Sequence, residues 1–339
     1  MAEYLMITGS FPPQVCGVGD YVGRFMEAAD NSKWKLFHSL DWKLKTLAAK
    51  IRQISSSECP TIIMQYPTQG YGWSLVPHIL CLYFSWFSRK KFIVVMHEFS
   101  QLSFKARLAG IMLMSANKII FTNEFEKGYV HRRLCVPLKK CGVVKIISNI
   151  SVAPKIKDWQ DRHIDIAYFG HIRPNKGLED FFRVADDILK KCKVKVCLIG
   201  QLLPEFATYF ESLCRKYPDI NIEIRHNLSD YEVADSLNDT KVAFLPFPDG
   251  LSERRGSFLA AISNGAVVVS YKGEFTTARL EEIAVLTLPC KASQCILDII
   301  DTAFEDQYEQ FRSECENYSR NDIPGSWQTV VEMYESIIN

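Results

Sequence analysis

168-YFGHIRPNKGLEDFF-182 reads as a buried strand, a short basic loop and an amphipathic helix in immediate succession. A strand that passes directly into a helix is half of a βαβ unit. Arg173 and Lys176 lie in the loop, just before the helix begins at Gly177. Because a helix N-terminus carries partial positive charge, two cations placed there predict a site for a diphosphate. A basic turn that is simply solvated is the alternative.

The same alternation of strand and helix continues through nearly all of the 339 residues. Eight apolar runs predict strands, at 4–8, 61–66, 92–97, 118–122, 164–169, 194–200, 241–246 and 266–270. Their Val/Ile/Leu-rich runs lack polar alternation, which is typical of parallel strands covered on both faces. Helix-like stretches such as 178–191 and 203–217 fall between them. The predicted fold class is therefore α/β, with two doubly wound Rossmann-like domains facing across a cleft.

The polar segment 151-SVAPKIKDWQDRH-163 interrupts this pattern near the middle of the chain. We therefore expect an N-terminal Rossmann-like domain over 1–152, a linker over 153–163 and a C-terminal Rossmann-like domain over 164–315. The remaining segment, 316–339, has helical spacing with a break at Pro324–Gly325. A terminal helix that packs back on the first domain would explain that break.

Composition limits the function further. The net charge of +1 provides no overall attraction to nucleic acid or anionic membrane, so such attraction must come from local patches. From its acidic residue and brief apolar run, we expect the N-terminus not to be a secretory signal. The longest apolar stretch, 75–87, is too short to span a membrane and fits a buried helix. Eleven cysteines without a CxxC pair predict reduced thiols in a cytoplasmic protein. No HExxH or DxD motif is present, so we expect no metal centre.

The first half offers two candidate features. Gly17 and Gly19 lie where a loop meets a helix, so backbone N–H groups there could face an anion. Their spacing after Gly9 is not the GxGxxG fingerprint, which argues against a nicotinamide oxidoreductase; glycines for a tight turn are the alternative. His97 ends a predicted strand at the carboxyl edge, where ligands bind in such sheets. A histidine capped by local backbone groups is the other interpretation.

The second half repeats the basic loop in 245-LPFPDGLSERRGSFLAAISNGAVVVSYKG-273. A strand, a proline-rich loop and a helix of small residues follow one another, and two arginines precede the helix. This arrangement predicts a second hold on phosphate, with acidic and hydroxyl groups that suit a sugar. A solvated charge cluster is the alternative. The candidate ligand contacts are Asp249, Ser252, Glu253, Arg254, Arg255, Gly256 and Ser257.

Taken together, these features resemble a GT-B glycosyltransferase of family 4. The resemblance rests on the order of the glycine-rich loop after Pro12–Pro13, the strand-ending histidine, IISNIS at 146–151, GHIRPNKGLEDFF at 170–182 and the donor-helix-like block 247–270. It covers nearly the whole chain. The resemblance implies a retaining, metal-independent transferase that uses a nucleotide-diphosphate sugar as co-substrate and needs no other cofactor.

The resemblance also implies roles for single residues. Lys176 matches the lysine that holds the donor diphosphate. The partner arginine of the family is here His171, so Arg173 or the pair Arg254–Arg255 takes over its role. With His97, this makes Arg173, Lys176 and Arg255 the expected catalytic residues.

On the acceptor side, which is the first domain, Gly17 and Gly19 match the loop that faces the donor phosphates and the acceptor. His97 matches a histidine near the acceptor and the transferred sugar. Asn149 matches the asparagine of the hinge before the second domain.

One departure from the family pattern leaves a second function open. The family often carries two glutamates eight positions apart around the donor helix, and here Ser252 and Ala260, or Glu253 and Ala261, stand at those places. The alternative is a catalytically impaired nucleotide-sugar-binding or scaffold protein of the same fold.

The acceptor is expected to be a saccharide or a lipid-linked cell-envelope molecule, and no nucleic acid partner is expected. The basic runs 89–91, 132–133 and 139–140 accompany the apolar stretch 75–87 in the first half. Together they would form a face that rests on anionic lipid, which places the protein peripherally at the inner face of the membrane. Solvated lysines beside a buried helix are the alternative.

Overall fold

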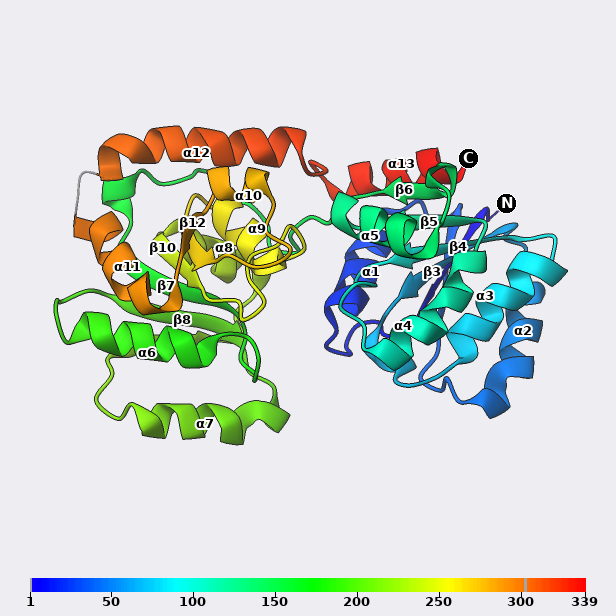
Figure 1. Cartoon of the computed structure of the whole chain (residues 1–339), viewed down its shortest axis with the longest axis horizontal. Coiled ribbons are helices and arrows are strands. Elements are labelled where there is room, and N and C mark those ends of the chain that lie inside the picture. Colours follow the sequence, from blue (N-terminus) through cyan, green and yellow to red (C-terminus); the bar gives the residue numbers. More distant parts are fainter. Residues whose placement is uncertain (1, 302–303) are drawn as a thin grey trace. The chain divides into compact units, whose positions relative to one another are not determined.

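The computed structural model describes residues 2–301 and 304–339 and divides the chain into two compact units. The first comprises Met1–Ile146 and Pro324–Asn339, and the second comprises Ile147–Ile323. Each unit is built on a six-stranded sheet whose paired strands are all parallel. Helices cover both faces of each sheet (Figure 1). The predicted class, two Rossmann-like α/β domains, is confirmed.

The first sheet has the strand order β2-β1-β3-β4-β5-β6. Its strands are β1 (Tyr4–Thr8), β2 (Trp34–His38), β3 (Thr61–Tyr66), β4 (Lys91–Met96), β5 (Lys118–Phe121) and β6 (Cys141–Val143). Its helices are α1 (Gly17–Ala28), α2 (Leu47–Ser55), α3 (Val76–Phe87), α4 (Phe104–Gly110), α5 (Glu124–Leu134) and α13 (Trp327–Ile338). Short 3-10 helices are η1 (Leu44–Thr46), η2 (Gln69–Tyr71), η3 (Ile111–Ser115) and η4 (Leu138–Lys140).

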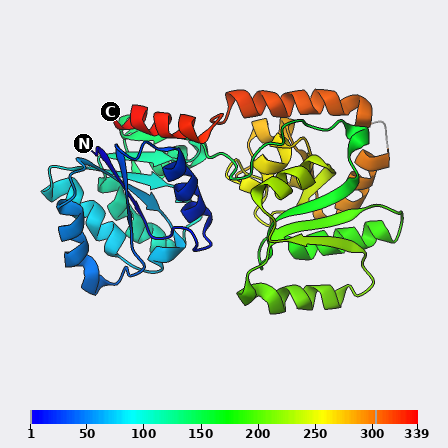
Figure 2. The same ribbon diagram turned by 180° about the vertical axis from the view of Figure 1, so that it is seen from behind.

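The last helix, α13, returns to the first unit and lies beside α1 (Figure 2). The hydroxyls of Tyr21 and Tyr334 are 3.1 Å apart in the buried contact between the two helices. Trp34 Nε1 donates a hydrogen bond of 3.0 Å to Glu335 Oε1. Ser326 starts α13 by accepting a hydrogen bond from a backbone N–H of its first turn, as a good N-cap does. The C-terminal segment is therefore part of the first unit's packing.

The second sheet has the order β12-β11-β10-β7-β8-β9. Its strands are β7 (Ile164–His171), β8 (Val196–Gln201), β9 (Ile222–His226), β10 (Thr240–Leu245), β11 (Val267–Tyr271) and β12 (Val285–Thr287). Its helices are α6 (Leu178–Leu189), α7 (Ala207–Lys216), α8 (Asp230–Asn238), α9 (Gly256–Ser263), α10 (Ala278–Glu282), α11 (Ala292–Asp301) and α12 (Phe304–Asn321). Its 3-10 helices are η5 (Trp159–Asp161), η6 (Pro204–Phe206) and η7 (Pro289–Lys291).

The eight strands predicted from the sequence are the eight inner strands of the two sheets. The four that were not predicted, β2, β6, β9 and β12, are the four edge strands. Every residue of β1 and β3 is buried, whereas β9 has exposed and half-buried positions only. Burial on both faces requires a continuous apolar run, and an edge strand is free of that requirement.

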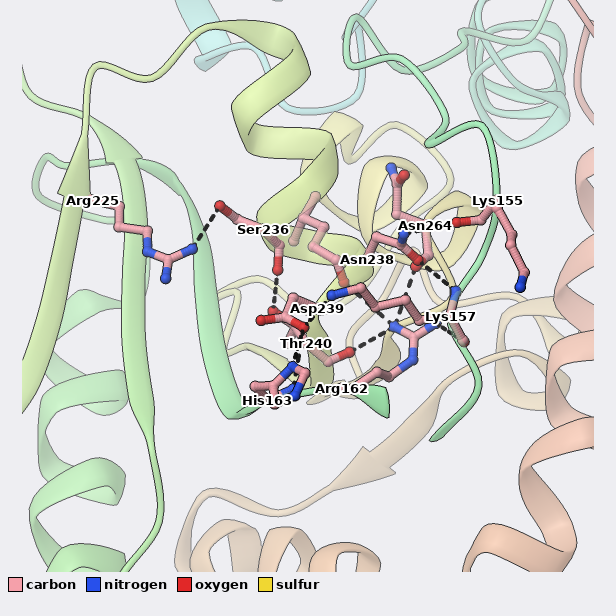
Figure 3. Close-up of polar contacts among 11 residues, drawn as sticks. Lys155, Lys157, Arg162, His163, Arg225, Ser236, Asn238, Asp239, Thr240 and Asn264 are labelled. Atoms are coloured by element: carbon pink, nitrogen blue, oxygen red, sulfur yellow. Dashed lines mark hydrogen bonds and ion pairs between the residues drawn. The ribbon is translucent and has the colours of Figure 1, made fainter. Parts of the chain in front are cut away.

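Residues 153–163 belong to the second unit and are hydrogen-bonded to its other residues (Figure 3). The buried Arg162 guanidinium donates to the carbonyl oxygens of Thr240 at 2.8 Å and of Lys157 at 2.9 Å. Asn238 bridges the same segment, because its side chain donates to Lys155 O and accepts from Lys157 N, both at 2.9 Å. The arginine thus satisfies carbonyl groups that would otherwise be buried without a donor.

Candidate functional site

In the second unit, the loops that follow the neighbouring strands β7 and β10 meet at the carboxyl edge of the sheet. Gly177, at the start of α6, has φ +82°. A Cβ at this position would lie 2.0 Å from the carbonyl oxygen of Pro246. Only glycine combines this left-handed backbone with so close an approach. Gly177 therefore brings the loop of Arg173 and Lys176 against the loop that begins at Pro246.

Tyr168 lies where the two basic segments converge. Its hydroxyl donates a hydrogen bond of 3.0 Å to the carbonyl oxygen of Lys176. Burial raises the pKa of Tyr168 well above its usual range, and the positive charges of Arg173 and Arg255 oppose that rise. Two arginines that are 82 positions apart in the sequence are thus close to one buried phenol.

The pKa of His171 is affected by the same cluster of positive charges. It ends β7 and is half-buried. Burial, followed by the charges of Lys176 and Arg173, lowers the pKa of His171 to about 4. The imidazole is therefore neutral at pH 7 and adds a hydrogen-bonding group without adding charge. A multivalent anion is the ligand that would offset the remaining cations best.

The arginine pair after β10 packs on aromatic rings. The guanidinium carbon of Arg255 lies 4.7 Å from the ring centre of Phe247, and that of Arg254 lies 5.3 Å from the ring centre of Phe275. Asp249 forms an ion pair with Arg255 through Oδ1 and Nη2. Such stacking holds the planar group in place. Asp249 is thus a partner of Arg255, in addition to being a candidate group for sugar hydroxyls.

Helix α9 begins next to this pair. Its N-cap, Arg255, makes no side-chain cap hydrogen bond, so Gly256 and Ser257 start the helix without such a cap. The space around Gly256 is open, since an added Cβ would meet no atom within 4 Å. The Ser252 hydroxyl is buried and makes no hydrogen bond with residues 2–301 or 304–339. A helix N-terminus of this kind, beside arginines, suits an anion.

Glu253 lies on another side of the same loop. Burial raises the pKa of Tyr318, in α12, and the negative charge of Glu253 contributes to that rise. The carboxylate of Glu253 is therefore close to α12, whereas Asp249 is close to Arg255.

The first unit contains the other three predicted residues. Gly17 starts α1 after Cys16, which makes no side-chain cap hydrogen bond. An added Cβ at Gly19 would lie 3.2 Å from atoms of Ser10, so glycine allows α1 to approach the loop after β1. Gly17 is exposed with open space around it, and sterics do not require glycine there.

His97 follows β4 directly and is buried. Its Nε2 is 2.7 Å from Gln65 Oε1, and its backbone N–H donates to Tyr66 O at 2.9 Å. The imidazole ring makes an edge contact with Tyr21 of α1, with 5.4 Å between ring centres. His97 is therefore held by side chains of the first unit, on the sheet edge from which α1 starts.

Two groups near these positions were not singled out by the sequence reading. Tyr168 looked like an ordinary strand residue, and only the meeting of two loops reveals its place. Asp20 lies in the first turn of α1, where burial raises the pKa of its carboxyl group and Arg24 opposes that rise. Its position three residues after Gly17 was the available signal.

Metal ligands, membrane-spanning helices and cysteines are described for residues 2–301 and 304–339. No group of three or more His, Cys, Asp or Glu residues in these ranges could hold a metal ion. Within the same ranges, none of the helices has the length and apolar content that crossing a bilayer requires. All eleven cysteines lie in these ranges and are free thiols.

Comparison with known proteins identifies the fold. No protein-family model and no curated protein matches the chain. The structure of Anabaena Alr3699/HepE in complex with UDP and glucose matches with a TM-score of 0.69 at 14% identity, covering 100% of this chain and 99% of that one. Sucrose-phosphate synthase (tll1590) from Thermosynechococcus elongatus matches with a TM-score of 0.71 at 15% identity, covering 100% and 98%. The lipopolysaccharide outer core galactosyltransferase WaaB matches with a TM-score of 0.64 at 11% identity, covering 100% and 99%. The chain therefore has the GT-B glycosyltransferase fold and resembles enzymes of family 4 in structure.

Proposed function

We propose that the protein is a retaining, metal-independent glycosyltransferase that moves a sugar from a nucleotide-diphosphate sugar to a saccharide or lipid-linked acceptor in the cytoplasm. The observation that carries the proposal is the convergence of Arg173, Lys176 and Arg255 around Tyr168 and His171 at the carboxyl edge of the second sheet. The UDP in the HepE complex supports a nucleotide diphosphate as the ligand of this fold. The free cysteines are consistent with a reducing compartment.

The proposed reaction breaks the bond between the anomeric carbon and the β-phosphate oxygen and forms a bond to the acceptor oxygen. The acceptor hydroxyl gives its proton to the departing phosphate, and both events take place on one face of the sugar. Negative charge develops on the β-phosphate as it leaves. Cations already fixed by the fold stabilise that charge without reorganising, and we assign this role to Lys176, Arg173 and Arg255.

The remaining contacts are assigned by position. The N-terminus of α9, with Gly256 and Ser257, and the arginine Arg254 would bind the donor phosphates, and Asp249, Ser252 and Glu253 would bind donor hydroxyls. Gly17 and Gly19 would face the acceptor side through backbone N–H groups. His97, fixed by Gln65, would contact the transferred sugar.

The test replaces Lys176 and Arg255 separately by alanine and measures sugar transfer and donor binding. Removing one preorganised transition-state contact typically lowers the rate by about 10²–10³-fold. Lys191→Ala is the matched control, since Lys191 lies just after α6 and pairs with the half-buried Asp187. Unchanged turnover in both site variants would refute the proposal, provided that circular dichroism shows unchanged folding.

A second candidate is a nucleotide-sugar-binding or scaffold protein that has lost catalysis. It is favoured by the absence of a carboxylate at Ser252 and Ala260 and by the ion pair that Arg255 already makes with Asp249. Thermal-shift measurements with several nucleotide sugars, followed by donor-hydrolysis and transfer assays, separate the two candidates. Binding without any turnover across donors and acceptors would favour the second.

A further inference from the structure

The two units carry opposite net charge. The first has 19 lysines and arginines against 11 aspartates and glutamates, and the second has 21 against 28. The first unit is therefore net positive by 8 and the second net negative by 7, which together make the chain's net charge of +1. Although the net charge of the whole chain is near zero, the first unit is positive enough to be attracted to anionic surfaces.

The basic face expected from the sequence is only partly available to such a surface. Lys90 Nζ donates to the carbonyl oxygens of Ser57 at 2.6 Å and Cys59 at 2.7 Å. Lys140 Nζ donates to Met114 O at 2.6 Å. Burial lowers the pKa of both lysines. Two of the lysines in the runs 89–91 and 139–140 are thus occupied by backbone carbonyls inside the unit.

A different face combines exposed apolar groups with available lysines. We call it the loop face, and its residues lie in the loops that follow β2 and β3. The exposed fraction of Trp73 is 85%, and that of Leu40 is 75%. The apolar members of the loop face are Leu40, Leu44, Trp73 and Leu75.

A hydrogen bond and an aromatic contact join the loop after β2 to the loop after β3. Ser74 Oγ donates a hydrogen bond to the carbonyl oxygen of Trp42. Beneath the surface, the ring of Trp42 packs edge-on against the ring of Tyr71, with 4.6 Å between ring centres. Both rings are buried, so the loop face rests on a packed base. Its exposed side chains therefore have no packing role that would explain their apolar character.

The two chain segments that form the loop face carry few negative charges. Lys43 and Lys45 are exposed on either side of Leu44. Asp41 is the one carboxylate from residue 31 to residue 57, and its Oδ1 accepts a hydrogen bond of 2.9 Å from the backbone N–H of Lys43. From residue 59 to residue 97 the sequence has no carboxylate at all. This charge distribution is complementary to an anionic lipid headgroup layer.

We propose that the loop face docks on an anionic lipid bilayer, with the Trp73 indole at the headgroup level and lysines on the lipid phosphates. Tryptophan is suited to this interface because its ring is apolar and its N–H is polar. β2 and β3 flank β1, so these loops lie at the same sheet edge from which α1 starts at Gly17. This part of the inference rests on the proposed glycosyltransferase function: docking at this position brings a lipid-linked acceptor to the acceptor side of the first unit.

The experiment measures co-sedimentation of the full chain with vesicles of phosphatidylcholine alone and of phosphatidylcholine mixed equally with phosphatidylglycerol. We expect binding to the mixed vesicles that salt weakens. Trp73→Ser should lower the partition coefficient about tenfold, as expected for the loss of one inserted aromatic side chain. The double variant Lys43→Gln/Lys45→Gln should lower it about thirtyfold on the mixed vesicles, since each lysine near an anionic surface contributes about 1 kcal/mol.

Trp86→Ser is the matched control, because Trp86 is also exposed in the first unit, at 65%, but lies at the end of α3. It should leave binding unchanged. Absence of binding at low salt, or loss of binding in Trp86→Ser with retention in Trp73→Ser, would overturn the proposal. So would self-association that Trp73→Ser abolishes without any vesicle binding, which would assign the face to a second copy.

Donor binding separates this proposal from the proposed function. The Trp73→Ser variant should keep the thermal shift produced by a nucleotide diphosphate, because Trp73 lies in the first unit and the cations proposed to bind the diphosphate lie in the second. Vesicle binding without any donor binding would refute the glycosyltransferase and leave the docking face standing. Transfer of sugar from the donor to soluble saccharides, without any vesicle binding, would refute the docking face and leave the glycosyltransferase standing.

Discussion

The neutral state of His171 leads to a prediction about stability and pH. The ordinary pKa of histidine is 6.5, and in the folded protein burial, Lys176 and Arg173 lower the pKa of His171 to about 4. Between these values the unfolded chain binds a proton that the folded chain does not bind. The free energy of unfolding therefore falls as the pH falls from about 6.5 to about 4. A difference of about 2.5 in pKa corresponds to about 3 kcal/mol.

The perturbation is His171→Gln, which removes this titration and keeps a polar side chain. Urea unfolding of both proteins is measured at neutral pH and at steps down to about pH 4. The free energy of unfolding of the wild type should fall relative to the variant by about 3 kcal/mol across this range. Other histidines and carboxylates are present in both proteins, so the difference isolates His171.

Direct titration supplies the refuting result. The NMR signal of the His171 imidazole should remain that of the neutral form until well below pH 6, and titration near 6.5 would refute the electrostatic argument.

A bound nucleoside diphosphate would offset the charges of Lys176 and Arg173 and raise the pKa of His171. Calorimetry in buffers of different ionisation enthalpy should then detect proton uptake on binding at mildly acidic pH. Binding without proton uptake would place the diphosphate elsewhere.

Three further predictions concern stability. Gly177→Ala combines a left-handed φ with a backbone clash and should lower the free energy of unfolding by about 3 kcal/mol in urea titrations, whereas Gly256→Ala, in open space, should change it by less than about 1 kcal/mol. Arg162→Ala should cost about 3–5 kcal/mol by the same measurement, because it leaves buried carbonyl oxygens without a donor; a loss below 1 kcal/mol would contradict this. Tyr21→Phe should cost about 1 kcal/mol, and combining it with Tyr334→Phe should cost less than the sum of the two single changes, which a double-mutant cycle measures.

Inner and outer strands differed in how well the sequence predicted them. Runs such as 61-TIIMQY-66 and 266-AVVVS-270 have neighbours on both sides in the sheet, and their apolar continuity is visible in the sequence. β9, with the sequence IEIRH, alternates apolar and charged residues and lies at an edge. Its pattern is too short and too polar to stand out from a loop. Edge strands therefore needed the tertiary structure.

The candidate donor site shows a similar division. The sequence placed Arg173, Lys176 and Arg255 before helices, because the strand–loop–helix pattern is local. It could not show that Asp249 pairs with Arg255 or that Glu253 lies near α12. Both carboxylates are in one short loop, and only packing decides which way each side chain turns.

By itself the sequence determined the α/β class, the inner strands and the basic loops at helix starts, since hydrophobic periodicity and turn residues act over a few positions. Tertiary structure decided the neighbours of each charge. Burial beside Lys176 and Arg173 lowers the pKa of His171, and backbone carbonyls occupy two lysines that looked available for lipid. The return of α13 to the first unit also brings Glu332 and Glu335 there, which lowers the net positive charge of that unit from 10 to 8. Charges and buried groups interact through space, so their consequences depend on contacts between distant positions that no local pattern records.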